Sequence, residues 1–466
     1  MSTRRFDRLR RTLRRSKDLV DSPSLSDADA QRVVEAVDAL LTEPDTTTKR
    51  AAAERLVDAY LALDDTGRTR FMETVAVNFG TDADAVDAAA ATLRTATGPD
   101  ERLAAERALR RAVTPRYAEL LHVVTGMPHG VSHLVGLRAD LLAVASPHPA
   151  LGLFGDELAG HLSTLFDVGL LELRQITWDS PASVLERLMA TERVHEISGW
   201  DDVQHRLTGD QRVYGFFHPA LPNEPIAFVE VALSRGLADD LVHLLERDAP
   251  VERPDTAIFY AITSAQPGLG GIHLGNELIK QVVDALRRAD DRLERFATLS
   301  PLPRFRSWLV QQVRDDALTP FEAAAFGDDA LAVAQLTDRA WIDDPTIAER
   351  VKPAILSAAS RYLATTTPDR EPARVIDPVE NFHLSNGASV EQLNWMANPA
   401  PYGIEQSLGL MVNYLYDRGR IASTRGYLIE GTVRRVGRRQ GSGQDVEGTL
   451  IRARIWATNR VARLLR

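Results

Sequence analysis

A turn rich in glycine lies at residues 268–275, between a run typical of a strand at residues 256–263 and an amphipathic helix expected at residues 275–288. The first amides of a helix have no partner inside it, so they point at whatever lies in the turn and can bind phosphate. Glycine lets the backbone approach an anion closely. The spacing matches neither the dinucleotide fingerprint nor the phosphate loop that ends in Gly-Lys-Ser/Thr. The turn is therefore either an anion site or an ordinary strand-to-helix connection.

Three further segments are polar, aromatic or rich in proline where a plain core would be apolar. Residues 216–225, which include His218, join two expected strands. Ser300 ends a short strand just before a helix that is expected to begin at a proline, over residues 303–313. His383 lies among amide and hydroxyl side chains. From residue types alone, Ser300 is either a helix cap or a catalytic hydroxyl, and His383 either a hydrogen-bonded core histidine or a catalytic group.

The part of the chain before these segments is predicted to be helical almost throughout. From Ser26 to about Gly169, alanine-rich faces and leucines at spacings of three and four indicate successive helices. Ser26 is placed to cap the first of them. The expected helices include residues 27–41, 48–63, 82–96, 99–112, 131–145 and 156–166. The apolar and basic pattern of residues 4–15 predicts an amphipathic helix that packs on its own domain. The alternatives are a transit peptide and a membrane-surface helix.

The pattern changes near Leu171, where β-rich runs begin to alternate with helices. The expected strands are residues 171–178, 212–217, 226–233 and 256–263, and the expected helices are residues 183–190, 275–288 and 303–313. The last third of this part is looser and ends in a basic tail at residues 450–466, which is expected to be helical. The sequence therefore predicts an all-helical part followed by a mixed α/β part, in the α+β class.

The composition excludes several classes of site and partner. The 466-residue chain has no cysteine, which excludes thiol nucleophiles, iron–sulfur clusters and disulfides. Its formal net charge of −10 argues against nucleic acid as the main partner, since phosphate binding requires clustered cations. No stretch approaches the ~20 consecutive apolar residues of a membrane span. His129 and His133 lie four residues apart, but no acidic residue follows at ligand spacing, so we expect no metal site.

Taken together, these segments resemble a known family. The glycine turn, beginning at Gln266, resembles the coenzyme A pyrophosphate loop of GNAT-type N-acetyltransferases. Six segments, in this order, are similar to malonyl-CoA decarboxylases. They are residues 217–225, 268–275, 299–303, 382–388, 394–397 and 409–416. A helical match at residues 137–142 extends the resemblance, which therefore covers most of the chain.

The resemblance implies a fold and an activity. It implies a helical domain for oligomerisation or support at residues 1–170, and a catalytic acyl-CoA-binding domain at residues 171–466 that resembles the GNAT acetyltransferase fold. The family converts malonyl-CoA to acetyl-CoA and carbon dioxide without metal or organic cofactor, a step in fatty acid metabolism. We expect a cytoplasmic homo-oligomer, such as a tetramer.

The resemblance also implies the residues of the site. Ser300 and His383 would be the catalytic pair, and Tyr416 would lie near the substrate. The residues expected to contact the coenzyme A moiety are Gly270, Gly271, Ile272, His273, Leu274, Gly275 and Asn276. His273 is a departure, because family members carry Glu at this position, so any role of that carboxylate is in doubt here.

Decarboxylation of a malonyl thioester leaves electrons at C2, which delocalise onto the thioester oxygen, so no further electron sink is needed. Ser300 would hold the carboxylate or bond to the enolate oxygen, and His383 would protonate C2, because an imidazole with a near-neutral pKa can give up a proton. Arg304, Arg306 and Lys280 are either cations for the coenzyme A phosphates or surface groups. The alternative functions are an acyl-CoA-dependent acyltransferase and a non-catalytic malonyl-CoA sensor.

Overall fold

The computed structural model describes residues 19–145, 148–192, 194–246, 250–272, 275–367 and 374–416, with the strand segments 430–433, 435–437 and 451–454. The amphipathic helix expected at residues 4–15 lies outside the described residues. Within the basic tail, only Ile451–Arg454 is described, and it forms strand β11, which pairs antiparallel with β9. The helix expected for these four residues is therefore wrong, because backbone pairing with another strand determines their conformation.

The chain divides into two compact units. The helical unit comprises Met1–Glu172 together with Phe216–Ile226 and Ser264–His273, and the sheet unit comprises Leu173–Gly215, Ala227–Thr263 and Leu274–Arg466. Two loops that follow strands in the sequence thus belong to the helical unit, and one of them is the glycine turn. The predicted α+β class is confirmed: a helical region precedes a region built on a mixed sheet.

The helices of the helical unit follow the expected pattern closely. They are α2 (Asp27–Thr42), α3 (Thr46–Leu61), α4 (Asp65–Asn78), α5 (Ala83–Thr95), α6 (Pro99–Ala112), α7 (Tyr117–Thr125), α8 (Gly130–Leu142) and α9 (Pro149–Leu165), with short 3₁₀ turns at Val168–Leu170 and Pro267–Leu269. Ser26 caps α2 as predicted, since its hydroxyl accepts from the Asp29 amide at 3.2 Å. The sequence does not single out α4 and α7, although both lie in the region predicted to be helical.

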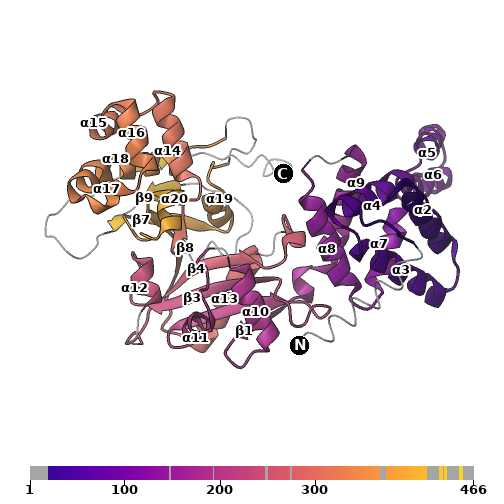
Figure 1. The fold of residues 1–466 in the computed structure, drawn as a ribbon, viewed down its shortest axis with the longest axis horizontal. Coiled ribbons are helices and arrows are strands. Elements are labelled where there is room, and N and C mark those ends of the chain that lie inside the picture. The colour runs from indigo at the N-terminus through magenta and orange to yellow at the C-terminus, as the bar shows by residue number, and fades with distance from the viewer. Residues whose placement is uncertain are drawn as a thin grey trace. The chain divides into compact units, whose positions relative to one another are not determined.

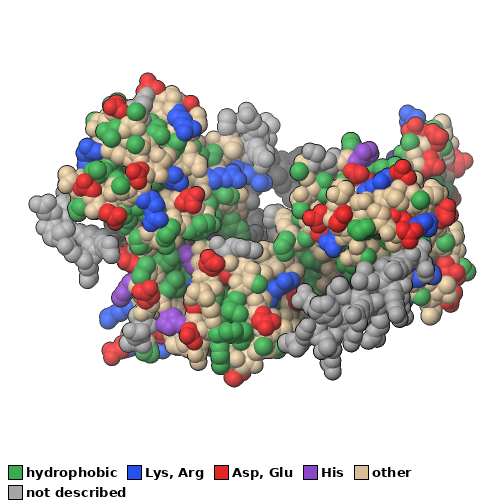
Figure 2. Space-filling view, viewed as in Figure 1, with side chains coloured by type: hydrophobic (Ala, Val, Ile, Leu, Met, Phe, Trp, Pro, Cys, Tyr) green, Lys and Arg blue, Asp and Glu red, His purple; other side chains and the backbone are tan. Residues whose placement is uncertain are grey.

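The core of the helical unit forms where α3, α4, α7, α8 and α9 pack together (Figure 1). α5 and α6 form a pair of their own, and their outer faces carry many of the acidic side chains that are visible on this unit in Figure 2. α5 has no buried residue, whereas α9 buries Leu151, Phe154, Leu158 and Leu162 at spacings of three and four. The bundle is therefore held by apolar stripes on its inner helices.

The sheet unit alternates strands and helices in its first half and is mainly helical in its second half. Its strands are β1 (Glu172–Ile176), β2 (Gln211–Phe217), β3 (Ala227–Ser234), β4 (Thr256–Ser264), β5 (Arg295–Thr298), β6 (Ser300–Pro301), β7 (Ala388–Asn394), β8 (Met411–Tyr416), β9 (Glu430–Val433), β10 (Arg435–Gly437) and β11. Its helices are α10 (Ala182–Thr191), α11 (Trp200–Arg206), α12 (Leu241–Leu245), α13 (Gly275–Ala289), α14 (Phe305–Arg314), α15 (Pro320–Phe326), α16 (Asp329–Thr337), α17 (Ala340–Asp343), α18 (Pro345–Leu363), α19 (Pro378–Ser385) and α20 (Pro401–Ser407).

One large sheet organises this unit. Its strand order is β1-β2-β3-β4-β5-β8-β7-β10, and β6 pairs with β8 beside this path. β4 and β5 are parallel, whereas β8 is antiparallel to β5, β6 and β7. The strands expected at residues 171–178, 212–217, 226–233 and 256–263 correspond to β1 through β4. β7, β8 and the cluster of α15 to α18, at the upper left of Figure 1, are not predicted by the sequence patterns.

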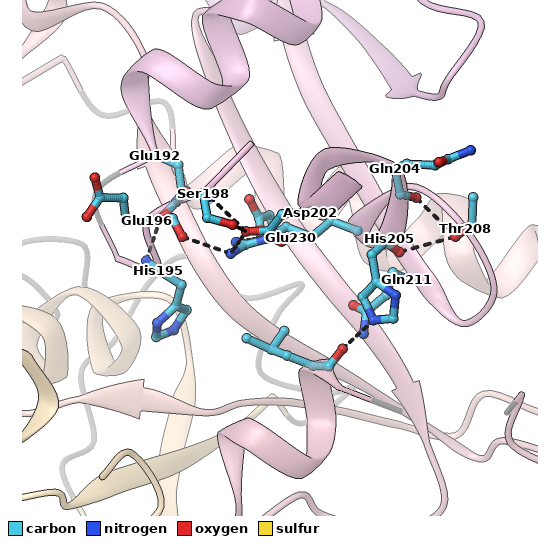
Figure 3. Close-up of polar contacts among 12 residues, drawn as sticks. Glu192, His195, Glu196, Ser198, Asp202, Gln204, His205, Thr208, Gln211 and Glu230 are labelled. Atoms are coloured by element: carbon cyan, nitrogen blue, oxygen red, sulfur yellow. Dashed lines mark hydrogen bonds and ion pairs between the residues drawn. The ribbon is translucent and has the colours of Figure 1, made fainter. Parts of the chain in front are cut away.

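A buried ion pair joins β3 to α11 (Figure 3). Arg206 donates to Glu230 at 3.0 Å and to Asp202 at 2.8 Å, and its remaining amino group donates to the Glu196 carbonyl at 3.2 Å. Glu230 is fully buried in β3, and burial raises its pKa to about 7 although Arg206 acts in the opposite direction. Removing Arg206 would leave the buried Glu230 without its charged partner, which typically destabilises a fold by ~3–5 kcal/mol.

The raised pKa of Glu230 predicts a pH-dependent stability. Between the ordinary pKa of 4.5 and about 7, folded Glu230 holds a proton that the unfolded chain has lost, so its contribution to stability falls as pH rises through this range. Glu230→Gln should remove that decline, because an amide does not titrate. Melting temperatures between pH 5 and 8 would measure the slope. Glu405→Gln, at an exposed carboxylate, is the control, and an equal slope in Glu230→Gln and the wild type would contradict the assignment.

Candidate active site

Strand β8 brings together segments that lie far apart in the sequence. Ser300 in β6 pairs with Val412, and Ala388, the first residue of β7, pairs with Tyr416 at the end of β8. Alternate residues of a strand face the same side, so Val412, Tyr414 and Tyr416 share one face of β8. Ser300 and Tyr416 are thereby held at two points along one strand, and the chain enters β7 opposite Tyr416.

The segment before β7 is the short helix α19, which carries His383 in its last turn. Pro378 occupies the first helical position, and the Asp377 carboxylate caps the helix by accepting from the amides of Val379 and Glu380 at 2.9 and 2.8 Å. The helix ends at Ser385, and Gly387, two residues later, has a φ of +80°, in the left-handed region that glycine adopts readily. These local signals fix where the imidazole leaves the helix.

The three polar side chains form one continuous chain of hydrogen bonds. Ser300 Oγ lies 3.1 Å from His383 Nε2, and His383 Nδ1 lies 2.7 Å from the Tyr416 hydroxyl. All three residues are buried, with His383 only 2% exposed. Burial lowers the pKa of His383 to about 3 and raises the pKa of Tyr416 above its ordinary range. The imidazole is therefore neutral at physiological pH, and the near-neutral pKa expected from the sequence is wrong because burial disfavours the cation.

The hydrogen-bond partners select one tautomer of His383. The Tyr416 hydroxyl is buried and needs an acceptor, and among the described residues its hydrogen-bond partner is His383 Nδ1. Tyr416 therefore donates to Nδ1, which places the imidazole proton on Nε2, facing Ser300 Oγ. Ser300 accepts that proton, so its own hydroxyl hydrogen is free to point elsewhere. Ser300 is not a helix cap, since α14 begins at Phe305 and is preceded by Arg304.

A second layer of aromatic and acidic side chains surrounds the imidazole. The Tyr414 ring stacks on His383 with centroids 4.6 Å apart, and Phe259 contacts the Tyr416 ring edge-on at 6.3 Å. Behind α19, the Tyr362 hydroxyl donates to the Asp377 carboxylate at 2.9 Å. The carboxylate that caps α19 is therefore also held by a hydrogen bond from α18. The packing leaves the imidazole little freedom to rotate away from its two hydrogen bonds.

Buried amides hold β8 at the correct place beside β5. β5 and β8 share a single register pair, Ala297 with Leu415, so their backbones are not joined by a regular ladder. Asn413 fills the gap: its amide donates to the Thr298 carbonyl at 2.8 Å, and its side-chain oxygen accepts from Asn394 at 2.7 Å. Sequence reasoning placed both asparagines in family motifs but gave them no role. Their contacts show that they position the strand that carries Tyr416.

The glycine turn is built within the helical unit. The buried Arg138 of α8 donates to the carbonyls of Gly268 and Gly270 at 2.6 and 2.9 Å. A Cβ at Gly268 would lie 1.9 Å from the Val135 carbonyl, so only glycine fits against α8 there. Gln266, at the start of the turn, donates to Glu224 at 3.3 Å, which ties the turn to the proline-rich loop. Sequence reasoning did not identify Arg138, whose acceptors are backbone atoms 130 residues or more away.

The residues predicted to bind coenzyme A are divided between the units. Gly270, Gly271 and Ile272 belong to the helical unit, and Gly271 has a φ of +81°, which requires glycine's freedom. His273, Leu274 and the side chain of Asn276 lie outside the described residues. Gly275 opens α13 in the sheet unit, where a Cβ would meet the Phe382 ring at 3.1 Å. Phe382 in turn contacts the His383 ring, with centroids 5.1 Å apart, so the start of α13 lies close to the histidine.

The three predicted phosphate-binding cations have different surroundings. Arg306 donates to the carbonyls of Leu336 and Glu405, so it serves the fold. Lys280 lies 3.8 Å from Glu277 on the same helix, and Arg304 is exposed before α14. In the described part of the chain, no group of three or more His, Asp or Glu side chains is arranged to hold a metal ion, and no helix is long and apolar enough to cross a membrane.

Comparison with known proteins gives a consistent result. A model of the malonyl-CoA decarboxylase C-terminal domain matches residues 169–438, and one of the N-terminal domain of the same enzymes matches residues 79–166. The mitochondrial malonyl-CoA decarboxylase of the goose Anser anser anser is 33% identical over 339 residues, which are 67% of this chain and 66% of the relative. The mouse enzyme is 33% identical over 337 residues, 67% of this chain and 68% of the relative.

Solved structures extend the match to the fold. Malonyl-CoA decarboxylase from Rhodopseudomonas palustris superposes with a TM-score of 0.76 at 36% identity, covering 85% of this chain and 95% of the other. The enzyme from Agrobacterium vitis gives a TM-score of 0.77 at 35% identity, covering 84% and 94%. Since the C-terminal model alone spans more than half of the residues, this chain belongs to the malonyl-CoA decarboxylase family of carboxy-lyases.

Proposed function

We propose that this protein converts malonyl-CoA to acetyl-CoA and carbon dioxide without a cofactor, and that Ser300 and His383 carry the reaction. The observation that supports this best is the buried chain of hydrogen bonds from Tyr416 through His383 to Ser300. It ends in a free hydroxyl hydrogen and contains no charged group. Such a chain can donate to an oxygen that becomes negative during the reaction, and each bond in it polarises the next.

The first step is loss of carbon dioxide. The bond between C2 and the carboxylate breaks, and its electron pair delocalises into the thioester to form an enolate, so the thioester itself is the electron sink. Ser300 donates its hydroxyl hydrogen to the enolate oxygen, or holds the carboxylate out of the thioester plane. A donor placed where charge develops lowers the barrier without having to reorganise. The sequence does not distinguish these two roles of Ser300. A hydroxyl hydrogen that is not used in the bond to His383 can serve in either.

The second step is protonation of C2. The proton comes from Nε2 of His383, either directly or through the Ser300 hydroxyl, while Tyr416 passes its own proton to Nδ1. The imidazole remains neutral throughout, because it gains a proton on one nitrogen as it loses one from the other. Tyr416 then recovers a proton from solvent, a step that is favoured because burial raises its pKa.

Incubation with malonyl-CoA alone, in the presence of a chelator and without biotin, nicotinamide or ATP, tests the reaction. We expect acetyl-CoA and carbon dioxide in equal amounts. Both products would be measured, with an amine acceptor added in a parallel sample. Acyl transfer to the amine without gas release would instead indicate an acyltransferase. Tight binding without turnover would indicate a sensor, and loss of activity with the chelator would contradict the cofactor-free mechanism.

Substitution of the proposed pair tests the mechanism. Ser300→Ala and His383→Asn should each lower turnover by ~10²-fold or more, because a lost transition-state donor or proton source acts on the rate and not on binding. Acetyl-CoA affinity should change little. Ser360→Ala is the matched control, since the hydroxyl of this buried serine donates to the Leu356 carbonyl of its own helix. A Ser300→Ala or His383→Asn enzyme with near-normal turnover would remove that residue from the mechanism.

Tyr416→Phe tests the assigned tautomer. The ring contact with Phe259 would remain, but Nδ1 would lose its donor, so the imidazole proton could move to Nδ1 and Nε2 would accept from Ser300. We expect turnover to fall by roughly 10-fold, since a general acid–base contribution is weakened but not deleted. Nitrogen chemical shifts of His383 would report the tautomer directly. A wild-type imidazole protonated at Nδ1 would contradict the role proposed for Tyr416.

A further inference from the structure

Strand β1 forms one edge of the large sheet. It ends the strand order, so β2 pairs with one of its two sides, and it lies at the lower border of the sheet unit in Figure 1. In the described part of the chain, no hydrogen bond between backbone groups joins Glu172–Ile176 to a loop. An edge strand presents amides and carbonyls with which a further strand can pair.

The side chains of β1 alternate between the two faces of the sheet. Glu172, Arg174 and Ile176 share one face, and Leu173 and Gln175 share the other. Glu172 and Gln175 are exposed, Leu173 and Arg174 are half-buried, and Ile176 is buried. The strand thus begins with an acid, a leucine and a base. Charges on an edge deter most added strands and permit those in which opposite charges meet.

A second copy of β1 meets this condition in one register. When two copies pair antiparallel across a two-fold axis that passes through one residue, the residues before and after that residue face each other. An axis through Leu173 places each Glu172 opposite an Arg174, and the two leucines opposite each other. An axis through Arg174 would bring two guanidinium groups together, and an axis through Glu172 two carboxylates. The charges of the strand therefore select the register centred on Leu173.

Exposed apolar side chains lie beyond both ends of β1. Leu170 precedes the strand by two residues and Trp178 follows it by two, and both are exposed. The Trp178 ring meets the exposed Trp200 ring with centroids 6.1 Å apart. Antiparallel pairing brings the end of β1 in one copy beside the start of β1 in the other, so the tryptophans approach the segment that contains Leu170. Burial of such aromatic surface favours association.

We propose that β1 pairs antiparallel with β1 of a second copy of this chain, with Leu173 on the two-fold axis, so that the two sheets become continuous. A strand of another protein would need an acid, an apolar residue and a base in the same order, which β1 itself contains. The interface then uses one patch twice, as two-fold dimers do. Such pairing is independent of the reaction proposed at His383.

The chain has no cysteine, so an introduced thiol reports the register directly. In Leu173→Cys the two thiols lie on directly opposite residues, whose Cα atoms are ~4.5–5.5 Å apart in antiparallel strands, within the span of a disulfide. We expect the full-length variant to form a disulfide-linked dimer under mild oxidation. Gln175→Cys is the control on the same face. Gln175 would face Leu171 of the second copy, so its two thiols would lie ~13 Å apart along the strand and should not link.

Charge reversal in the Leu173→Cys background tests the contacts that select the register. Arg174→Glu places like charges opposite each other at two symmetric positions, so the initial rate of dimer linkage should fall about tenfold or more. Adding Glu172→Arg to this variant exchanges the two charges and makes opposite charges meet again, so the rate should recover. Circular dichroism of each variant would check that it folds.

Sedimentation of the wild-type chain completes the test, and we expect an assembly with an even number of copies. A wild-type monomer, or failure of Leu173→Cys to link, would overturn the pairing of two copies and leave the edge to a different strand. Linkage of Gln175→Cys at the same rate would overturn the register. An unchanged rate in Arg174→Glu would overturn the role of the charges.

Discussion

Burial of a neutral imidazole is the constraint on which the candidate site depends. His383 lies in the interior, where ionisation is disfavoured and both ring nitrogens must find partners. Ser300 and Tyr416 supply those partners, one to each nitrogen. Three features bring these side chains within hydrogen-bond distance of one another. They are the helix cap at Asp377, the left-handed glycine at Gly387 and the strand order around β8. A shift of any of these elements would leave a buried polar atom unpaired.

The glycine turn is supported within the helical unit, through backbone atoms. The buried Arg138 guanidinium donates to the carbonyls of Gly268 and Gly270 and so supports the shape of the turn. Within the turn, the amides of Leu269, Gly270 and Ile272 donate to the carbonyls of Gln266, Pro267 and Leu269, so its own hydrogen bonds also hold its shape. The chain then continues into α13, whose first residue lies against Phe382 and so beside the His383 ring.

Local signals in the sequence predict the parts of the fold that local interactions stabilise. α2 and α6 are predicted to within a residue, because Ser26 and Pro99 mark their starts. β8 is buried on both faces, so it lacks the alternation that identifies a strand. Residue types left Ser300 between a cap and a catalytic group, because its partner His383 is 83 residues away. Only the resemblance joined the two, and the topology around β8 gives the physical reason.

The absence of charge in the Tyr416–His383–Ser300 chain suits the proposed reaction. A malonyl carboxylate begins with a localised negative charge, and decarboxylation spreads that charge over the thioester. A fixed cation beside the carboxylate would stabilise the starting state most, and would therefore raise the barrier. Neutral donors in a dry site stabilise a localised carboxylate less than water does, yet still bond to the enolate oxygen. In the proposed reaction, the burial that keeps His383 uncharged would thus also favour the transition state over the bound substrate.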